Sequence, residues 1–257
     1  MLTFKSSSLL FILSLAICGL LVYVFSISCW WFIIPVFLFK AAIIYGSATI
    51  QSNFYLKAYN SASTTEKKIA ITFDDGPNPL YTQKILSILT EYQAKATFFL
   101  IGKNIDGNEH ILNEIYNQGH LIGGHSFNHG FFIDFKSVNG FIEEINQTNH
   151  LIETTIGKRP RLFRPPYGVT TPNIASAVKK LKQDVIGWNV RSLDTTNDST
   201  EIVYNRVITQ LKPGSIVLFH DTSDKTVEVL KQTLNFAEEN GFKIVNVDEL
   251  LKIQAYE

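Results

Sequence analysis

The distribution of apolar residues divides the chain into an apolar N-terminal segment and a longer part in which apolar and polar residues alternate. Between residues 8 and 45 only Lys40 is charged. An apolar run over about 9–27 has the length that crosses a bilayer as a helix, and a second run follows over about 30–46. We therefore predict a membrane anchor within residues 1–50 that contacts lipid, in the form of a two-helix hairpin.

Two other interpretations of this start are a single span and a cleavable signal peptide. The apolar region is long for a signal peptide, and no small-residue cleavage site follows it promptly. In a hairpin, Lys5 and Lys57 would flank the pair while the connector lacks Lys and Arg, so the positive-inside rule would place both ends in the cytoplasm. A single span would place the soluble part outside. These few charges leave open which face of the membrane carries the soluble part.

Beyond the anchor, short β-rich runs alternate with longer helical patterns. Residues 51–67 are polar, so we predict a linker there and one domain over 68–257. The predicted strands are Ile69–Phe73, Ala96–Ile101, Leu121–Gly124, Leu162–Arg164, Val185–Val190, Ser215–Phe219 and Lys243–Val245. The predicted helices are Thr82–Tyr92, Glu109–Gln118, Phe141–Ile156, Pro172–Leu181, Thr200–Leu211, Thr226–Asn240 and Val247–Ile253. Seven such repeats indicate an α/β fold with a parallel sheet covered by helices.

Polar residues at the strand ends favour a barrel over an open sheet. The residues at or just after the carboxyl ends of the predicted strands are Asp74, Asp75, His125, Arg164, Asp194 and His220. Side chains from five or six strands can converge on one place when the strands close into a barrel, whereas the crevice of an open sheet is reached from fewer strands. We therefore expect a barrel with one site at its carboxyl end.

The composition excludes several classes of function. The chain has 23 basic and 23 acidic residues, and this neutral balance argues against nucleic-acid binding. Both cysteines, Cys18 and Cys29, lie in the apolar start. The soluble part therefore has no cysteine nucleophile, thiolate metal site or disulfide. A neutral polymer or a small molecule remains open as substrate, and nothing in the sequence indicates a protein partner.

Two clusters contain candidate metal ligands. Asp74 and Asp75 end an apolar strand before a Gly-Pro turn, where a solvated turn is the alternative interpretation. Neighbouring strand residues point to opposite sides, so we expect one aspartate to bind a metal and the other to accept a proton. His125 and His129 have the spacing of one face of a helical turn. With one aspartate they would form a His₂Asp site that keeps a position open and suits Zn, Co, Ni or Fe.

Two further clusters contain candidates for acid catalysis and charge stabilisation. In the R-P-P-Y-G string at 164–168, Arg164 could keep a neighbouring carboxylate ionised, and the backbone N–H of Tyr167 could stabilise an oxyanion. His220 directly follows an apolar strand and could act as a general acid oriented by Asp194. A buried structural histidine is the alternative at that position.

Taken together, these strings resemble the polysaccharide deacetylases, which are carbohydrate esterase family 4 with its NodB-like domain. The likeness rests on T-F-D-D-G-P at 72–77, H-S-x-x-H at 125–129 and R-P-P-Y-G at 164–168, and it extends from about Lys68 to Ile253. It implies an irregular (β/α)7 barrel with one divalent metal ion, commonly zinc. It also implies removal of N-acetyl or O-acetyl groups from an amino-sugar polysaccharide such as peptidoglycan or a chitin-like glycan.

The resemblance also assigns a role to each candidate residue. It implies that the metal ligands are Asp75, His125 and His129, that the base is Asp74 supported by Arg164, and that the acid is His220 with Asp194 as its partner. It further implies that Tyr167, Pro165 and Leu218 contact the acetyl group or its oxyanion. Arg191 stands where the family usually has an aspartate, and Thr195 where it usually has a tryptophan, so the identity of the substrate is put in doubt.

We therefore expect a membrane-associated, metal-dependent deacetylase that releases acetate from a cell-envelope glycan. One alternative is a deacetylase of a lipid-linked sugar or of a small amide, because an anchored enzyme meets a lipid-borne substrate in two dimensions. Another alternative is a non-catalytic carbohydrate-binding barrel. That alternative is disfavoured by the presence of every expected ligand, the base and the acid.

Overall fold

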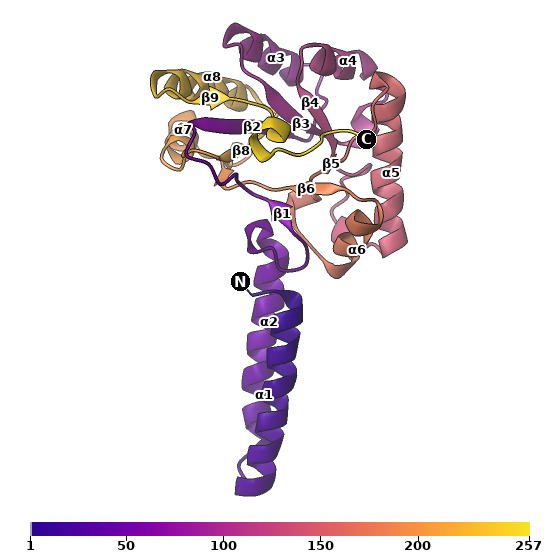
Figure 1. Cartoon of the computed structure of the whole chain (residues 1–257), viewed down its shortest axis with the longest axis vertical. Helices are drawn as coiled ribbons and strands as arrows, with labels where there is room; N and C mark the ends of the chain where they lie inside the picture. Colours follow the sequence, from indigo (N-terminus) through magenta and orange to yellow (C-terminus); the bar gives the residue numbers. More distant parts are fainter. Residues whose placement is uncertain (1) are drawn as a thin grey trace.

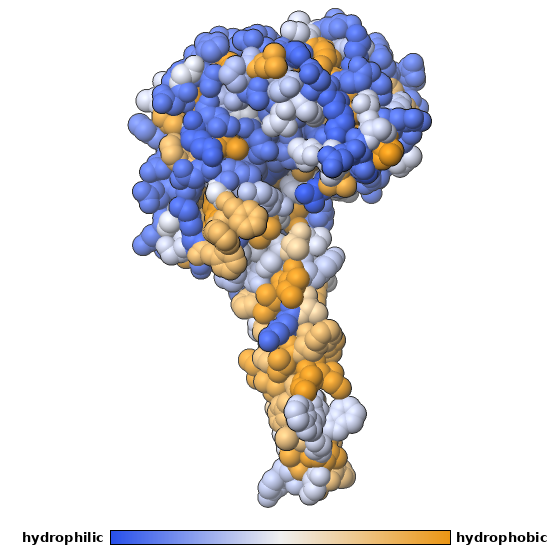
Figure 2. Space-filling model, turned by 180° about the vertical axis from the view of Figure 1, so that it is seen from behind, coloured by the Kyte–Doolittle hydropathy of each residue, from blue (hydrophilic) through white to orange (hydrophobic). Residues whose placement is uncertain are grey.

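The computed structural model describes residues 2–257 as a stalk of two helices and a globular part (Figure 1). Helix α1 (Phe4–Phe25) runs alongside a second helical stretch formed by η1 (Cys29–Phe32) and α2 (Ile33–Ala48). The stalk surface is mostly apolar, with one hydrophilic group partway along it, whereas the globular part is mostly hydrophilic (Figure 2). The structure therefore contains the predicted hairpin, and both helical stretches are long and apolar enough to cross a membrane.

Both ends of the hairpin meet the globular part. The backbone N–H of Phe4 donates to the carbonyl of Phe54 over 2.9 Å, so the start of α1 lies beside the chain that leaves α2. At the end of α2, the N–H of Thr170 donates to the carbonyl of Ser47 over 3.0 Å. The Thr170 hydroxyl also donates to the carbonyl of Gly46. The amino terminus and the globular part therefore lie at the same end of the stalk.

The globular part contains nine strands and seven α-helices among the residues described. The strands are β1 (Ala58–Tyr59), β2 (Lys68–Asp74), β3 (Ala96–Leu100), β4 (Leu121–Gly124), β5 (Leu162–Phe163), β6 (Asp184–Ile186), β7 (Val190–Arg191), β8 (Ile216–His220) and β9 (Lys243–Ile244). The helices are α3 (Tyr81–Glu91), α4 (Glu109–Asn117), α5 (Val138–Ile156), α6 (Pro172–Lys180), α7 (Thr200–Ile208), α8 (Asp224–Glu239) and α9 (Val247–Leu251). Short 3-10 turns are η2 (Ile50–Ser52), η3 (Gly102–Asn104), η4 (Ile133–Phe135) and η5 (Pro166–Gly168).

The strands form one curled parallel sheet in the order β1-β6-β5-β4-β3-β2-β8-β7, and β9 pairs with β2. Helices pack around its outside in the order α6, α5, α4, α3, α8, α7. The prediction of an irregular barrel is confirmed. The single strand expected over Val185–Val190 is instead two strands, because the chain bends between β6 and β7. Its first half pairs with β5 and its second half with β8, so this segment links the two ends of the curled sheet.

The segment 51–67, predicted to be a linker, is packed into the globular part. Strand β1 pairs in parallel with β6, placing Ala58 opposite Val185. Ser61 then forms an isolated antiparallel bridge with Ser215. The globular part therefore begins almost directly at the end of α2.

The barrel interior is built in layers by the register of β2 and β8. Ala70 pairs with Ile216, Thr72 with Leu218, and Asp74 with His220. Because side chains alternate between the two faces of a strand, these residues share the inner face, while the intervening apolar residues pack against the helices. The first of these layers is apolar, the second pairs a hydroxyl with an apolar side chain, and the last, at the carboxyl ends, contains a carboxylate and an imidazole.

Candidate active site

Asp74 is held by a fully buried arginine. Arg164 donates from Nη1 to Asp74 Oδ1 over 2.7 Å and to the Thr72 hydroxyl over 2.8 Å. Its Nε and Nη2 groups donate to the carbonyls of Ile186 and Gly187, each over 3.0 Å. The guanidinium is thus satisfied by strand ends on opposite sides of the barrel, which fixes one carboxylate oxygen of Asp74.

The environment of Asp74 suits a group that accepts a proton. Burial raises the pKa of the Asp74 carboxyl above its ordinary value, and the charge of Arg164 opposes that rise. The second oxygen, Oδ2, lies 3.8 Å from His125 Nε2 and so faces the histidines. A raised pKa and one oxygen directed into the pocket are what a general base requires.

Asp75, His125 and His129 come together as the sequence predicted. Asp75 Oδ1 lies 3.6 Å from His125 Nε2 and 3.5 Å from His129 Nε2. Their ligand atoms all lie within 4.8 Å of one another. The two aspartates do not point to opposite sides, because Asp75 leaves the strand with a φ of 79° and both carboxylates approach His125. The expectation of divergent side chains was wrong at this point.

The three residues fit a divalent cation. Asp75 Oδ1 is buried and has no hydrogen-bond partner among the described residues, so a cation would satisfy it. Ligands about 2.1 Å from a tetrahedral ion lie about 3.4 Å apart, close to the separations seen here. The second nitrogen of His125 lies 2.8 Å from the Arg164 carbonyl, which fixes the tautomer with Nε2 available. Burial lowers the pKa of His125 to about 3, so this imidazole is neutral, as a ligand must be.

His220 and Asp194 form the predicted pair. His220 Nδ1 lies 2.8 Å from Asp194 Oδ1, and the His220 backbone N–H donates to Asp194 Oδ2 over 2.8 Å. The hydroxyls of Ser192 and Thr226 donate to the same carboxylate. Burial acts to lower the pKa of His220, but the hydrogen bond and charge of Asp194 outweigh it and raise that pKa to about 9. His220 is therefore protonated at neutral pH, as a general acid requires.

The comparisons with known proteins agree with this geometry. The sequence pattern of the polysaccharide deacetylase family matches residues 61–186. A peptidoglycan-N-acetylglucosamine deacetylase of Bacillus cereus is 35% identical over 192 residues, which span 73% of this chain and 89% of the relative.

The chain belongs to the polysaccharide deacetylase family.

Two further comparisons extend this result. The peptidoglycan-N-acetylmuramic acid deacetylase PdaA of Bacillus subtilis is 28% identical, over 78% of this chain and 79% of the relative. The crystal structure of a peptidoglycan N-acetylglucosamine deacetylase in complex with 4-naphthalen-1-yl-N-oxidanyl-benzamide superposes with a TM-score of 0.74 at 27% identity, covering 77% of this chain and 94% of that one. The protein is thus an enzyme of the polysaccharide deacetylase type, a hydrolase of amide bonds, and the family predicted from the sequence is confirmed.

The remaining predicted residues line the same end of the deacetylase barrel. Tyr167 is 45% exposed, with a φ of 58°, and its ring packs 4.6 Å from that of His129. Pro165 is buried and accepts a hydrogen bond from the N–H of Gly168. Leu218 lies one layer below His220 and is 2% exposed. The roles of these three residues toward the acetyl group remain predictions.

The H-S-x-x-H segment of the deacetylase is a loop and not the helical turn that was predicted. Ser126 and His129 both have positive φ, at 65° and 48°. The loop is held by Glu144 of α5, which accepts from the N–H groups of Phe127 and Asn128 over 2.9 and 2.8 Å. Sequence analysis missed Glu144, because it reaches the histidines only through the tertiary packing of α5.

Replacing Glu144 should weaken metal binding in the deacetylase without touching a ligand. We expect Glu144→Gln to lower zinc affinity by roughly 10- to 100-fold, because the loop that carries both histidines loses its charged anchor. Competition with a chromogenic chelator measures this affinity. Glu143→Gln is the matched control, since Glu143 is exposed on the same helix and should leave affinity unchanged. Equal affinities in the two variants would show that Glu144 does not position the ligands.

Asp221 is a second buried carboxylate that the sequence analysis did not single out. It accepts from the Thr82 hydroxyl, and a Cβ added at Gly76 would lie 2.3 Å from its Oδ2. Burial raises the pKa of Asp221 to about 7. The close approach explains why glycine follows the aspartate pair, and it places Asp221 as a support beneath the turn that carries Asp75.

Proposed function

We propose that this protein is a metal-dependent N-deacetylase of peptidoglycan amino sugars that is held at the membrane by its hairpin. The observation that carries the proposal is the convergence of three metal-type ligands with a buried base and a protonated imidazole at one end of the barrel. Relatives named as peptidoglycan deacetylases support the choice of substrate class. The apolar hairpin supports the proposed location.

The proposed reaction adds water to an acetamide and releases acetate. A divalent ion held by Asp75, His125 and His129 would polarise the acetamide carbonyl and acidify a water molecule. Asp74 would accept a proton from a water molecule while the oxygen of that water attacks the acetyl carbon.

The remaining groups act on the tetrahedral species and on the leaving group. The backbone N–H of Tyr167 stabilises the oxyanion. His220 donates its proton to the nitrogen as the carbon–nitrogen bond breaks, giving the amine and acetic acid. Asp194 keeps His220 charged and fixes the ring, so His220 Nε2 is the nitrogen left to carry that proton.

An acetate-release screen tests the proposal. Purified protein should release acetate from peptidoglycan, the release should stop after treatment with a chelator, and zinc or cobalt should restore it. Chitin oligomers and a lipid-linked N-acetylated sugar in vesicles serve as comparison substrates. Release that persists after complete removal of divalent ions, or inactivity on every glycan, would contradict the proposal.

A lipid-linked glycan is a second candidate substrate, favoured by a specific contact. Thr170 follows the R-P-P-Y-G loop by two residues and bonds to the end of α2 at Gly46 and Ser47. One wall of the site is therefore attached directly to the hairpin. Faster release from the lipid-linked sugar than from peptidoglycan in the same screen would select this candidate.

A further inference from the structure

The most exposed apolar group on the globular part lies beside the metal-ligand loop. Phe131, Phe132 and Phe135 are 80%, 71% and 84% exposed. Their rings contact in sequence, with centroids 5.0 Å apart for the first pair and 6.4 Å for the second. Contiguous apolar patches of this kind on a soluble surface mark a contact with another phase or molecule. We call residues 131–135 the aromatic loop.

The aromatic loop is adjacent to the base of the hairpin. The carbonyl of Lys136, the next residue, accepts from the Asn173 side chain over 3.0 Å. Pro172, beside that asparagine, lines one depression together with Phe4 and Lys5 of α1. Figure 2 correspondingly shows hydrophobic surface on the globular part close to its junction with the stalk.

The length of the hairpin places this region at the bilayer surface. Helix α1 has 22 residues and is about 33 Å long, while the hydrocarbon core of a bilayer is about 30 Å thick. A bilayer that surrounds the hairpin therefore leaves little of it uncovered. The base of the globular part then lies at the headgroup layer, where aromatic side chains are favoured.

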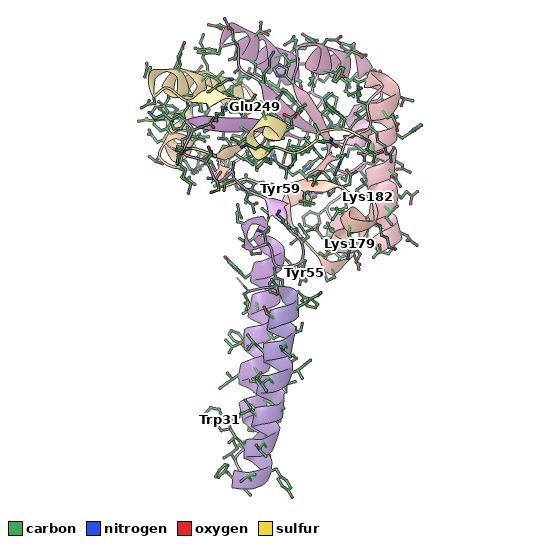
Figure 3. All side chains as sticks on the ribbon, in the orientation of Figure 1. Trp31, Tyr55, Tyr59, Lys179, Lys182 and Glu249 are labelled. Carbon is green, nitrogen blue, oxygen red and sulfur yellow. The ribbon has the colours of Figure 1, made fainter. Side chains whose placement is uncertain are left out.

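Charge on the neighbouring helix is consistent with the same surface. Lys179 and Lys180 end α6 and Lys182 follows, and all three are exposed. None takes part in an ion pair within residues 2–257. Figure 3 shows Lys179 and Lys182 near the base of the globular part, on the side of Tyr55. Unpaired lysines on this side of the globular part suit anionic lipid headgroups.

We propose that the aromatic loop inserts into the bilayer interface beside the hairpin, so that the membrane holds the globular part at two places. The inference rests on the proposed anchoring by the hairpin. Because the loop continues directly from His129, its insertion would hold the mouth of the site at the bilayer surface. The glycan that reaches this mouth is then the part of the envelope nearest to the membrane.

Spin-label depth measurements on the full chain in nanodiscs with anionic lipid test this proposal. One nitroxide is placed on Phe132→Cys in a chain whose two native cysteines are serine. A matched label on Ile202→Cys reports another exposed apolar position, on α7. A third label, in a separate chain that keeps Cys18 within α1 and has Cys29→Ser, reports whether the hairpin is inserted.

The expected result is that labels at 18 and 132 are more accessible to oxygen than to a water-soluble nickel chelate, and that the label at 202 shows the reverse. If 18 is lipid-exposed but 132 behaves like 202, the loop proposal is overturned while the anchor stands. If 18 is itself water-accessible, the anchoring fails, and the loop proposal fails with it. A loop that serves only to stack on sugar rings would also leave 132 in water.

Discussion

Asp74→Asn should lower the kcat/KM for acetate release by about 10²- to 10⁴-fold while the protein keeps its metal. The asparagine can still accept from Arg164 through its amide oxygen, but it cannot take a proton from water. The three proposed ligands remain in place, so the zinc content should match that of the wild type. Acetate release and metal analysis on the same preparation measure both effects.

The neighbouring residue provides the matched comparison. Asp75→Ala should lose activity together with metal, because it removes one of three ligands and leaves two imidazoles. Breaking the buried Asp74–Arg164 pair costs stability, so thermal unfolding of both variants must show a folded state at the assay temperature. A zinc-replete Asp74→Asn protein of wild-type activity would exclude this residue as the base.

Asp194→Asn should move the alkaline limit of activity to lower pH. The raised pKa of about 9 means that His220 stays protonated below that value and loses its proton as pH rises through it. Asn removes the hydrogen bond and the charge that raise the pKa, while burial, which lowers it, remains. We expect the pH at which kcat/KM falls on the alkaline side to drop by about two units or more, with a loss of roughly 10-fold or more at pH 8.

Asp198→Asn is the control for this pH profile. Asp198 lies on the same segment and pairs with Arg206, and it is not among the groups that shift the pKa of His220. Its variant should keep the wild-type limb. If kcat/KM of the Asp194 variant also falls at the same alkaline pH as that of the wild type, the imidazole of His220 is not the group whose deprotonation limits the reaction.

The site residues could be predicted because short strings place them at strand ends. Asp74 ends β2 and His220 ends β8, and the parallel register brings these two residues to the same layer. An apolar run followed by a polar residue is visible in one sequence. Since carboxyl ends of parallel strands meet at one end of a barrel, the convergence follows from that pattern.

The supports of the site could not be predicted in this way. Glu144 supports the loop at Asn128, and Asp221 packs under the turn at Gly76. In both cases the residue and the segment that it supports are distant in sequence. The loop of His125 and His129 has helical spacing but adopts positive φ, because its N–H groups bond to α5 and not to their own turn. Strand β1 has two residues, too few to show an alternating pattern.

The pairing of β1 with β6 limits how far the active site can move from the hairpin. If segment 51–67 were a flexible tether, the globular part could move about 20 Å away from the end of α2. Here β1, within segment 51–67, is paired with β6, and the end of α2 is hydrogen-bonded to Thr170, so the segment does not act as a flexible tether. A molecule anchored in this way would reach only the glycan that lies within a short distance of the membrane. Sugars farther out in the wall would be accessible only to enzymes that diffuse freely.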